Sequence, residues 1–313
     1  MAEMMKKATR ESGGLALKAL AEAYPNMIVL DADLAKATQT QIFAKEYPDR
    51  FIDCGIAESN MIGVAAGLAA AGKIPVAASF AMFSTGRAFE QVRNSVCYPH
   101  LNVKIIGTHA GVSVGEDGAT HQCIEDLAIM RAIPNMTVLC PCDGNEMRAA
   151  VKALLAYEGP AYMRLGRLAV ETVTDEIPGY KFELGKGCTL VDGTDVTIIA
   201  VGMNVQMALK AAEQLKAEGI SARVIDMHTI KPLDEEIIVK AARETGAIVT
   251  AEEHSVIGGL GSAVAEVVVK KCPVKMAMVG QQDTFGESGK PDELKAKYGM
   301  TAADIVKAVK GLR

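Results

Sequence analysis

Apolar runs of strand length alternate with longer helix-like stretches along this chain of 313 residues. In the first half, apolar runs lie at 27–33, 74–80 and 103–109, and a stretch rich in small residues that begins at Glu58 separates the first two. A second series predicts strands at 195–202, 221–228 and 247–254 and helices at 207–218, 234–245 and 262–270. Such alternation predicts parallel sheets with helices on both faces.

The segment between the two series divides the chain. Residues 173–190 contain Gly, Pro, Asp and Thr and carry no long helical pattern, which is typical of a linker. We therefore predict one domain at 1–172 and another at 191–313, each long enough for its own hydrophobic core. The predicted fold class is α/β, with two doubly wound parallel-sheet domains.

Composition excludes several classes of partner. The 33 basic and 38 acidic residues are interspersed and give a net charge of -5, so neither nucleic acid nor an anionic membrane is an expected partner. No apolar run approaches the length of a membrane span. The seven cysteines form no CxxC pair, and Cys140 and Cys142 are too close together for an ordinary zinc knuckle. These features predict a cytoplasmic protein with reduced thiols and no metal site of its own.

Two motifs in the first half place a carboxylate near aromatic rings. In GIAESNMIGVAAGLA, at 55–69, Glu58 begins a helix whose small residues allow close backbone approach. Phe80 and Phe83 follow at the end of the next predicted strand. An acid that complements a helix dipole and a phenylalanine pair in the core are the ordinary interpretations of these residues. Their succession within one short segment favours a shared site.

A third motif, GTHAGVSVGEDGATHQ at 107–122, leaves a predicted strand as a glycine-rich loop. It contains His109 and His121, two of the five histidines of the chain, and Asp117 between them. Open α/β sheets build their sites where strands end. This loop is therefore a candidate for catalytic chemistry.

Together these motifs resemble the pyrimidine-binding domain of transketolases, and the second half of the chain resembles the transketolase C-terminal domain. The resemblance implies a site for thiamine diphosphate. Glu58 would hydrogen-bond the pyrimidine ring nitrogen and activate the cofactor, and Phe80 and Phe83 would pack on the ring. Asp33 would lie near the cofactor and the subunit contact.

The same resemblance assigns the substrate site. His109 and His121 match residues that contact substrate hydroxyls and move protons, and Asp117 matches an acid that contacts a hydroxyl. Arg10 and Arg164 match arginines that bind the phosphate of sugar phosphates. The reaction implied is transfer of a two-carbon ketol unit from a ketose phosphate to an aldose phosphate.

The chain departs from the family pattern at two positions. Gly86 stands where many transketolases have a tyrosine, and Phe89 or a partner is expected to fill that space. Ala37 stands where the family has a phosphate-binding serine, with Thr38 beside it as a substitute.

The family's GDG motif with its later asparagine, which holds Mg²⁺ and the diphosphate, is missing from the sequence. We therefore expect the C-terminal subunit of a split transketolase. An N-terminal partner subunit would bind most of the Mg²⁺ and diphosphate, and the assembly would be a dimer of heterodimers.

Two alternatives stay open. The segment FSTGRAFEQVR at 83–93 is closer to deoxyxylulose phosphate synthases and to the beta subunits of 2-oxo acid dehydrogenases, whereas THQ at 120–122 favours ketol transfer. The chain could also be a noncatalytic module that kept the fold. Release of carbon dioxide from pyruvate would identify the first alternative. Replacement of Glu58 with Gln without any measurable effect would identify the second.

Overall fold

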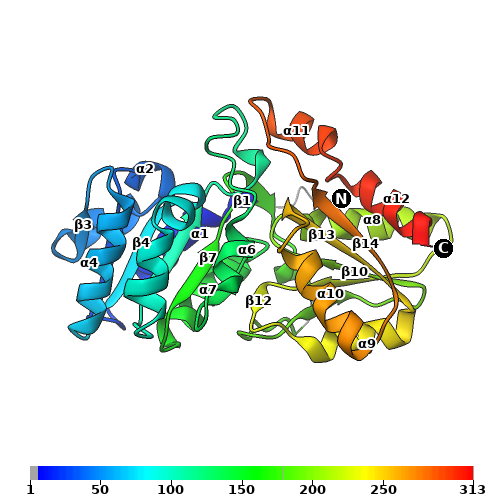
Figure 1. Ribbon diagram of the computed structural model, residues 1–313, viewed down its shortest axis with the longest axis horizontal. Coiled ribbons are helices and arrows are strands. Elements are labelled where there is room, and N and C mark those ends of the chain that lie inside the picture. Colours follow the sequence, from blue (N-terminus) through cyan, green and yellow to red (C-terminus); the bar gives the residue numbers. More distant parts are fainter. Residues whose placement is uncertain (1–5, 178, 313) are drawn as a thin grey trace.

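The computed structural model describes residues 6–177 and 179–312. Residues 1–5 and 313, at the ends of the predicted domains, and Pro178 in the predicted linker lie outside the described residues. Two α/β units lie side by side, the first drawn mainly in blue to green and the second in yellow-green to red (Figure 1). Across the described ranges, no helix has the length and apolar character needed to cross a membrane.

The first unit is built on a seven-stranded sheet in which all neighbours are parallel except β12 and β6. In spatial order the strands are β12 (Thr229–Lys231), β6 (Thr137–Leu139), β7 (Ala161–Arg164), β5 (Lys104–Thr108), β4 (Ile74–Phe80), β2 (Met27–Asp31) and β3 (Phe51–Asp53).

Side chains alternate between the two faces of this sheet, as a strand period of two requires. Val76 and Ala78 of β4 pack with α1 (Thr9–Leu20), α3 (Gln41–Glu46) and α7 (Gly144–Ala156). Ala77 packs with the opposite layer, which contains α4 (Glu58–Ala70) and α6 (Asp126–Ala132). The sheet is thus buried on both faces, which explains the continuous apolar runs seen in its strands.

The second unit has a five-stranded sheet, again parallel except at one edge. Its strands, in spatial order, are β14 (Lys275–Gln281), β13 (Ala247–Ser255), β10 (Val196–Ala200), β11 (Ala222–Asp226) and β9 (Cys188–Val191). Helices α8 (Asn204–Ala217) and α12 (Ala302–Leu312) supply side chains to the core of one face, and α9 (Glu235–Thr245) and α10 (Leu260–Lys271) to that of the other.

Short elements complete the fold. The strands β1 (Lys6–Ala8) and β8 (Ala169–Glu171) pair with each other. The remaining helices are α2 (Ala35–Thr38), α5 (Phe89–Gln91) and α11 (Pro291–Lys297); Met82–Arg87 and Val92–Cys97 form π-helical turns, and Pro48–Arg50, Val112–Val114 and Thr174–Glu176 form 3₁₀ turns.

The predicted α/β fold with two mainly parallel sheets is confirmed, with edge strands that the sequence did not predict. Strand β12 comes from the second unit and adds to the first sheet, and β9 begins inside the segment predicted as linker. Both strands are antiparallel and three or four residues long. Segments of three or four residues are too short to show the alternation of apolar and polar positions that predicts a strand. The apolar core also continues from α4 and α6 into α9 and α10, so the two units share one buried interface.

Candidate active site

The motifs found in the sequence gather at one edge of the seven-stranded sheet, where the parallel strands β2, β3, β4 and β5 end. Each connection that leaves this edge carries polar or aromatic residues. Carboxyl ends of parallel strands are where open α/β sheets place their ligands. This edge is therefore the candidate active site.

Glu58 is the first residue of α4, and its side chain is only 1% exposed. One carboxylate oxygen, Oε2, accepts a hydrogen bond from Arg87 Nη1 at 2.9 Å. The arginine side chain itself is 51% exposed. Among the described residues, Arg87 is the one side chain that hydrogen-bonds the Glu58 carboxylate, and it does so at Oε2. Glu58 thus offers a buried acceptor to a ligand while Arg87 balances its charge.

Two phenylalanines and two histidines form a ring cluster next to this edge. The Phe80 and His109 rings stack at 4.0 Å between centroids, and the Phe80 and Phe83 rings lie 6.0 Å apart. His121 meets the Phe83 ring edge-on at 5.2 Å. The guanidinium of Arg87 lies 4.5 Å from the Phe83 centroid and so connects the ring cluster with Glu58. The structure therefore brings these predicted residues together.

His109 is held in an unusual backbone conformation, with φ of 55°. Few residues other than glycine adopt this region, and those that do are concentrated at functional sites. Its Nδ1 lies 2.9 Å from Thr108 Oγ1, which leaves Nε2 for a substrate. Burial, with further contributions from the charges of Arg10 and Arg167, lowers the pKa of His109 to about 3. The imidazole is therefore neutral near pH 7.

Arg10 and Arg167 bring two guanidinium groups to this side of the site. Arg10 donates from Nη1 to Ala37 O at 2.5 Å and from Nε to Arg167 O at 3.2 Å. Arg167 binds Glu116 Oε2 at 2.9 Å. Burial and then the charge of Arg167 lower the pKa of Arg10. Arg10 also lies in the first turn of α1, where a cation opposes the helix dipole. A bound anion would offset both the unfavourable burial of the Arg10 charge beside Arg167 and its unfavourable interaction with the helix dipole.

Arg164 is not part of this group. It is 4% exposed, and its Nε donates to both carboxylate oxygens of Asp126, at 3.1 and 2.9 Å. Its Nη2 donates to Glu253 O at 2.6 Å, and Tyr162 also donates to Asp126. This guanidinium is committed to a buried ion pair. Arg167, three residues later in the same segment, was overlooked in the sequence; the second arginine of RLGR at 164–167 was the available signal.

The remaining predicted residues lie around the edge of the site. Asp33 and Asp117 are exposed, and the backbone amide of Asp33 donates to Asp53 Oδ1 at 3.0 Å. Thr38 is buried and donates to Asp31 Oδ2 at 2.7 Å. Its hydroxyl is thus already engaged and does not replace the serine missing at Ala37.

The second unit holds the loop that carries His109, Asp117 and His121. Glu253 Oε1 accepts a hydrogen bond from the backbone amide of Ser113 at 2.5 Å. Gly111, with φ of 84°, lies so close that an added Cβ would fall 2.4 Å from Glu253 Cδ. Gln122 Nε2 donates to Glu287 O at 2.8 Å. These contacts fix both ends of the loop from outside the first unit.

Replacing Glu253 with Ala should loosen this loop, because the buried Ser113 amide would lose its acceptor. Losing a buried partner costs about 1–3 kcal/mol, so hydrogen exchange at Ser113 is expected to accelerate by about tenfold or more. Mass spectrometry of peptides covering 107–122 would measure the change. Glu253→Gln keeps an acceptor oxygen and is the control. Equal exchange in wild type and Glu253→Ala would contradict the assigned role.

Comparison with known proteins assigns both units to described families. A model of the transketolase pyrimidine-binding domain matches residues 5–172, and one of the transketolase C-terminal domain matches residues 185–305. A putative transketolase C-terminal section from Methanocaldococcus jannaschii is 52% identical over 304 residues, which cover 97% of this chain and 95% of the relative.

A second relative and a solved structure are similar along most of their length. A 6-deoxy-6-sulfo-D-fructose transketolase subunit from a Clostridium species is 50% identical over 282 residues, or 90% of this chain and 87% of the relative. The structure described as a split gene transketolase, inactive beta4 tetramer, superimposes with a TM-score of 0.91 at 55% identity and covers 97% of this chain and 98% of that one.

Proposed function

Since the chain belongs to the transketolase family and spans its pyrimidine-binding and C-terminal domains, we propose that it is the C-terminal subunit of a split transketolase. With a separate N-terminal subunit it transfers a two-carbon ketol unit from a ketose phosphate to an aldose phosphate. The observation that carries this proposal is the meeting of the Glu58 carboxylate, the phenylalanine pair and two histidines at one sheet edge.

The residues present fit thiamine diphosphate, on which transketolases depend. When bound, this cofactor supplies the nucleophilic carbon and the electron sink of the reaction. The Glu58 carboxylate would hold a proton shared with the pyrimidine ring nitrogen, in a buried position where such a hydrogen bond is strong. Phe80 and Phe83 would pack on the ring. Asp33, exposed at a strand end, lies near the cofactor and the partner subunit.

The loop at 107–122 and two arginines recognise the substrate in this proposal. His109 is neutral, so its Nε2 can exchange a proton or a hydrogen bond with a substrate hydroxyl without adding charge. His121 assists it, and Asp117 binds a second hydroxyl. Arg10 and Arg167 hold the terminal phosphate, since planar guanidinium groups engage anion oxygens in pairs. In this proposal Arg167 takes the role that sequence comparison gave to Arg164, because Arg164 is bonded to Asp126.

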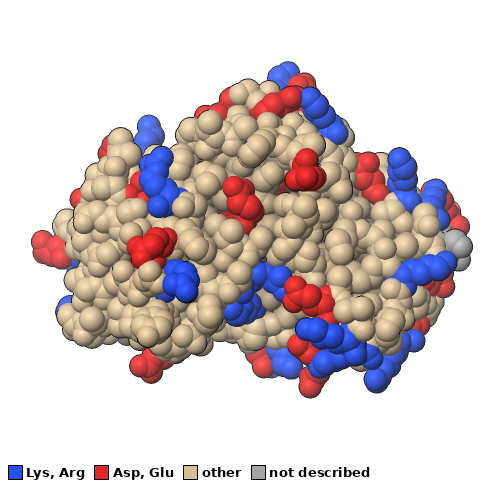
Figure 2. Space-filling model, in the orientation of Figure 1, with Lys and Arg blue, Asp and Glu red and all other residues tan. Residues whose placement is uncertain are grey.

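The site is completed by a partner. Ile56, two residues before Glu58, is 77% exposed, and an apolar side chain beside a cofactor site suits a subunit contact. We place Mg²⁺ and the diphosphate mainly on the N-terminal subunit, in a dimer of heterodimers. Figure 2 shows acidic and basic residues in small groups with broad uncharged areas between them, which suits such contacts. The seven free cysteines fit a cytoplasmic location.

The decisive experiment compares the chain alone with the two-subunit complex. We expect the chain alone to self-associate, as the split gene relative does, and to show neither ketol transfer nor tight binding of thiamine diphosphate with magnesium. Addition of the N-terminal subunit should produce both. Calorimetry, sedimentation and a coupled ketol-transfer assay measure the three properties. Donor phosphates should be compared with a 6-sulfonated ketose, because one relative is named for that sugar.

Two outcomes would count against the proposal. Tight magnesium-dependent binding of the cofactor by the chain alone would mean that the chain holds a diphosphate site. Carbon dioxide release from pyruvate by the complex, without ketol transfer, would identify a different thiamine enzyme.

A further inference from the structure

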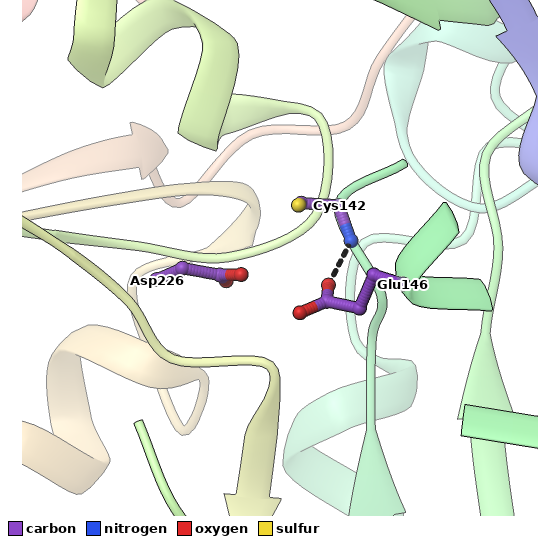
Figure 3. A group of neighbouring side chains, drawn as sticks. All are labelled: Cys142, Glu146 and Asp226. Carbon is purple, nitrogen blue, oxygen red and sulfur yellow. Dashed lines mark hydrogen bonds between the residues drawn. The ribbon is translucent and has the colours of Figure 1, made fainter. Parts of the chain in front are cut away.

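A second cluster of reactive side chains lies between the two units, away from the ring cluster. Cys142 follows β6, Glu146 belongs to the first turn of α7, and Asp226 is the last residue of β11. All three are 0% exposed. The thiol and one oxygen of each carboxyl group all lie within 4.8 Å of one another, and the side chains converge on a common point (Figure 3). Ligands from both units thus meet in one buried place.

In the described part of the chain, no N–H or O–H group donates a hydrogen bond to Asp226, whose side-chain neighbours are the Glu146 carboxyl and the Cys142 thiol. Both its carboxylate oxygens are buried and unpaired. Each carboxylate oxygen of Glu146 accepts one hydrogen bond, from the backbone amide of Cys142 at 2.6 Å and from the hydroxyl of Tyr180. An unpaired buried carboxylate costs several kcal/mol unless something neutralises it. The carboxylate of Asp226 points toward Glu146 and Cys142, where a neutralising group would sit (Figure 3).

Among the described residues no lysine or arginine forms an ion pair with these acids, and the buried His228 is the basic side chain that interacts with Glu146. Within residues 6–177 and 179–312, neither Glu146 nor Asp226 takes part in an ion pair, and the acid Asp143 lies nearby. Either protons or a cation must therefore balance these acids.

We propose that Cys142, Glu146 and Asp226 bind a divalent transition-metal cation, zinc above all, which clamps the two units together. A sulfur ligand favours zinc over Mg²⁺ or Ca²⁺, which take oxygen ligands. Three protein ligands leave one position of a tetrahedron for water, as in other three-ligand zinc sites. The sequence predicted no metal site because Cys142 lies too close to Cys140 for a zinc knuckle, and nothing in the sequence shows that Asp226 lies beside it.

The test uses the full chain and does not involve the proposed catalytic reaction. Chain purified from zinc-supplemented cells should contain about one equivalent of zinc by mass spectrometry. Replacement by Co²⁺ should give a thiolate-to-cobalt absorption band, which Cys142→Ser should abolish. Asp226→Asn should weaken zinc binding at least about tenfold, because even losing an outer-shell partner of a metal ligand costs about that much. Cys272→Ser, at a partly exposed thiol that follows α10, is the matched control and should bind like wild type.

Zinc should also raise the melting temperature of the metal-free chain, since binding to the folded state alone stabilises it. This measurement and the cobalt spectrum use wild type and do not depend on a variant folding. Wild-type chain with no zinc, no cobalt–thiolate band and no shift in melting temperature would overturn the proposal and leave shared protons as the neutralising groups. Zinc binding unchanged in Asp226→Asn would overturn it as well.

Discussion

Replacing Glu58 with Gln is expected to lower kcat of the two-subunit enzyme by about 10²–10⁴-fold, the usual contribution of a positioned proton-transfer group. Gln has the size of Glu and can still accept the hydrogen bond of Arg87, which joins Glu58 at 2.9 Å. It cannot hold the shared proton at the pyrimidine nitrogen. Steady-state ketol transfer measures the loss, and sedimentation verifies that the complex still assembles.

The control for this experiment is Glu213→Gln on the exposed face of α8, which should leave kcat unchanged. An assembled Glu58→Gln complex with full activity would favour the noncatalytic interpretation of the chain. A variant that fails to assemble would instead reveal a structural role for the buried carboxylate, and its activity would then say nothing about proton transfer.

The hydrophobic pattern was sufficient to predict the fold because both large sheets are buried on both faces. The runs at 27–33, 74–80 and 103–109 became β2, β4 and β5 with boundaries shifted by two residues at most. Carboxyl ends of parallel strands share one edge, so the motifs following these runs were bound to meet. The neighbourhood of Glu58, Phe80 and His109 could therefore be predicted from chain order alone.

Contacts between distant side chains could not be predicted in this way. Arg87 lies in a π-helical turn, and no spacing rule links such a turn to Glu58. Strand β12 crosses from the second unit to pair with β6, which draws the segment holding Asp226 toward Cys142. Glu253 reaches the amide of Ser113 across the same interface. These contacts depend on how the two units pack against each other, and no hydrophobic periodicity in the sequence predicts that packing.

The interface also gives the second unit a role in the proposed reaction. Loops are usually more mobile than the elements they connect. The loop with His109 and His121 is instead bound through Glu253 and Glu287, both in the second unit. Its hydrogen bonds restrict the histidines before any substrate arrives. Preorganisation of this kind reduces the entropy that binding would otherwise cost.

Replacing Arg167 with Ala should mainly raise KM for phosphorylated substrates, whereas replacing Arg164 with Ala should mainly lower the free energy of unfolding. Arg167→Ala removes a partly exposed guanidinium beside Arg10, so we expect KM for phosphorylated substrates to rise by about 10–100-fold, as for loss of a charged hydrogen bond. Because Arg167 also donates a hydrogen bond to Val114 O, stability should fall by about 0.5–1.5 kcal/mol, the usual loss for one hydrogen bond. An unphosphorylated aldose should show no such rise, which makes it the control substrate.

Arg164→Ala leaves Asp126 buried without its cation, at an exposed fraction of 0%. Breaking a buried pair in this way costs about 3–5 kcal/mol, so we expect a large loss in the free energy of unfolding, measured by urea denaturation. The ratio of KM values for phosphorylated and unphosphorylated substrates should stay near that of wild type. If instead Arg164→Ala raised this ratio and Arg167→Ala did not, the phosphate would lie deeper, toward β7, and Arg164 would have to leave Asp126 to reach it. Only a substantial rearrangement of the interface would permit that, because the same guanidinium also holds the carbonyl of Glu253 from the second unit.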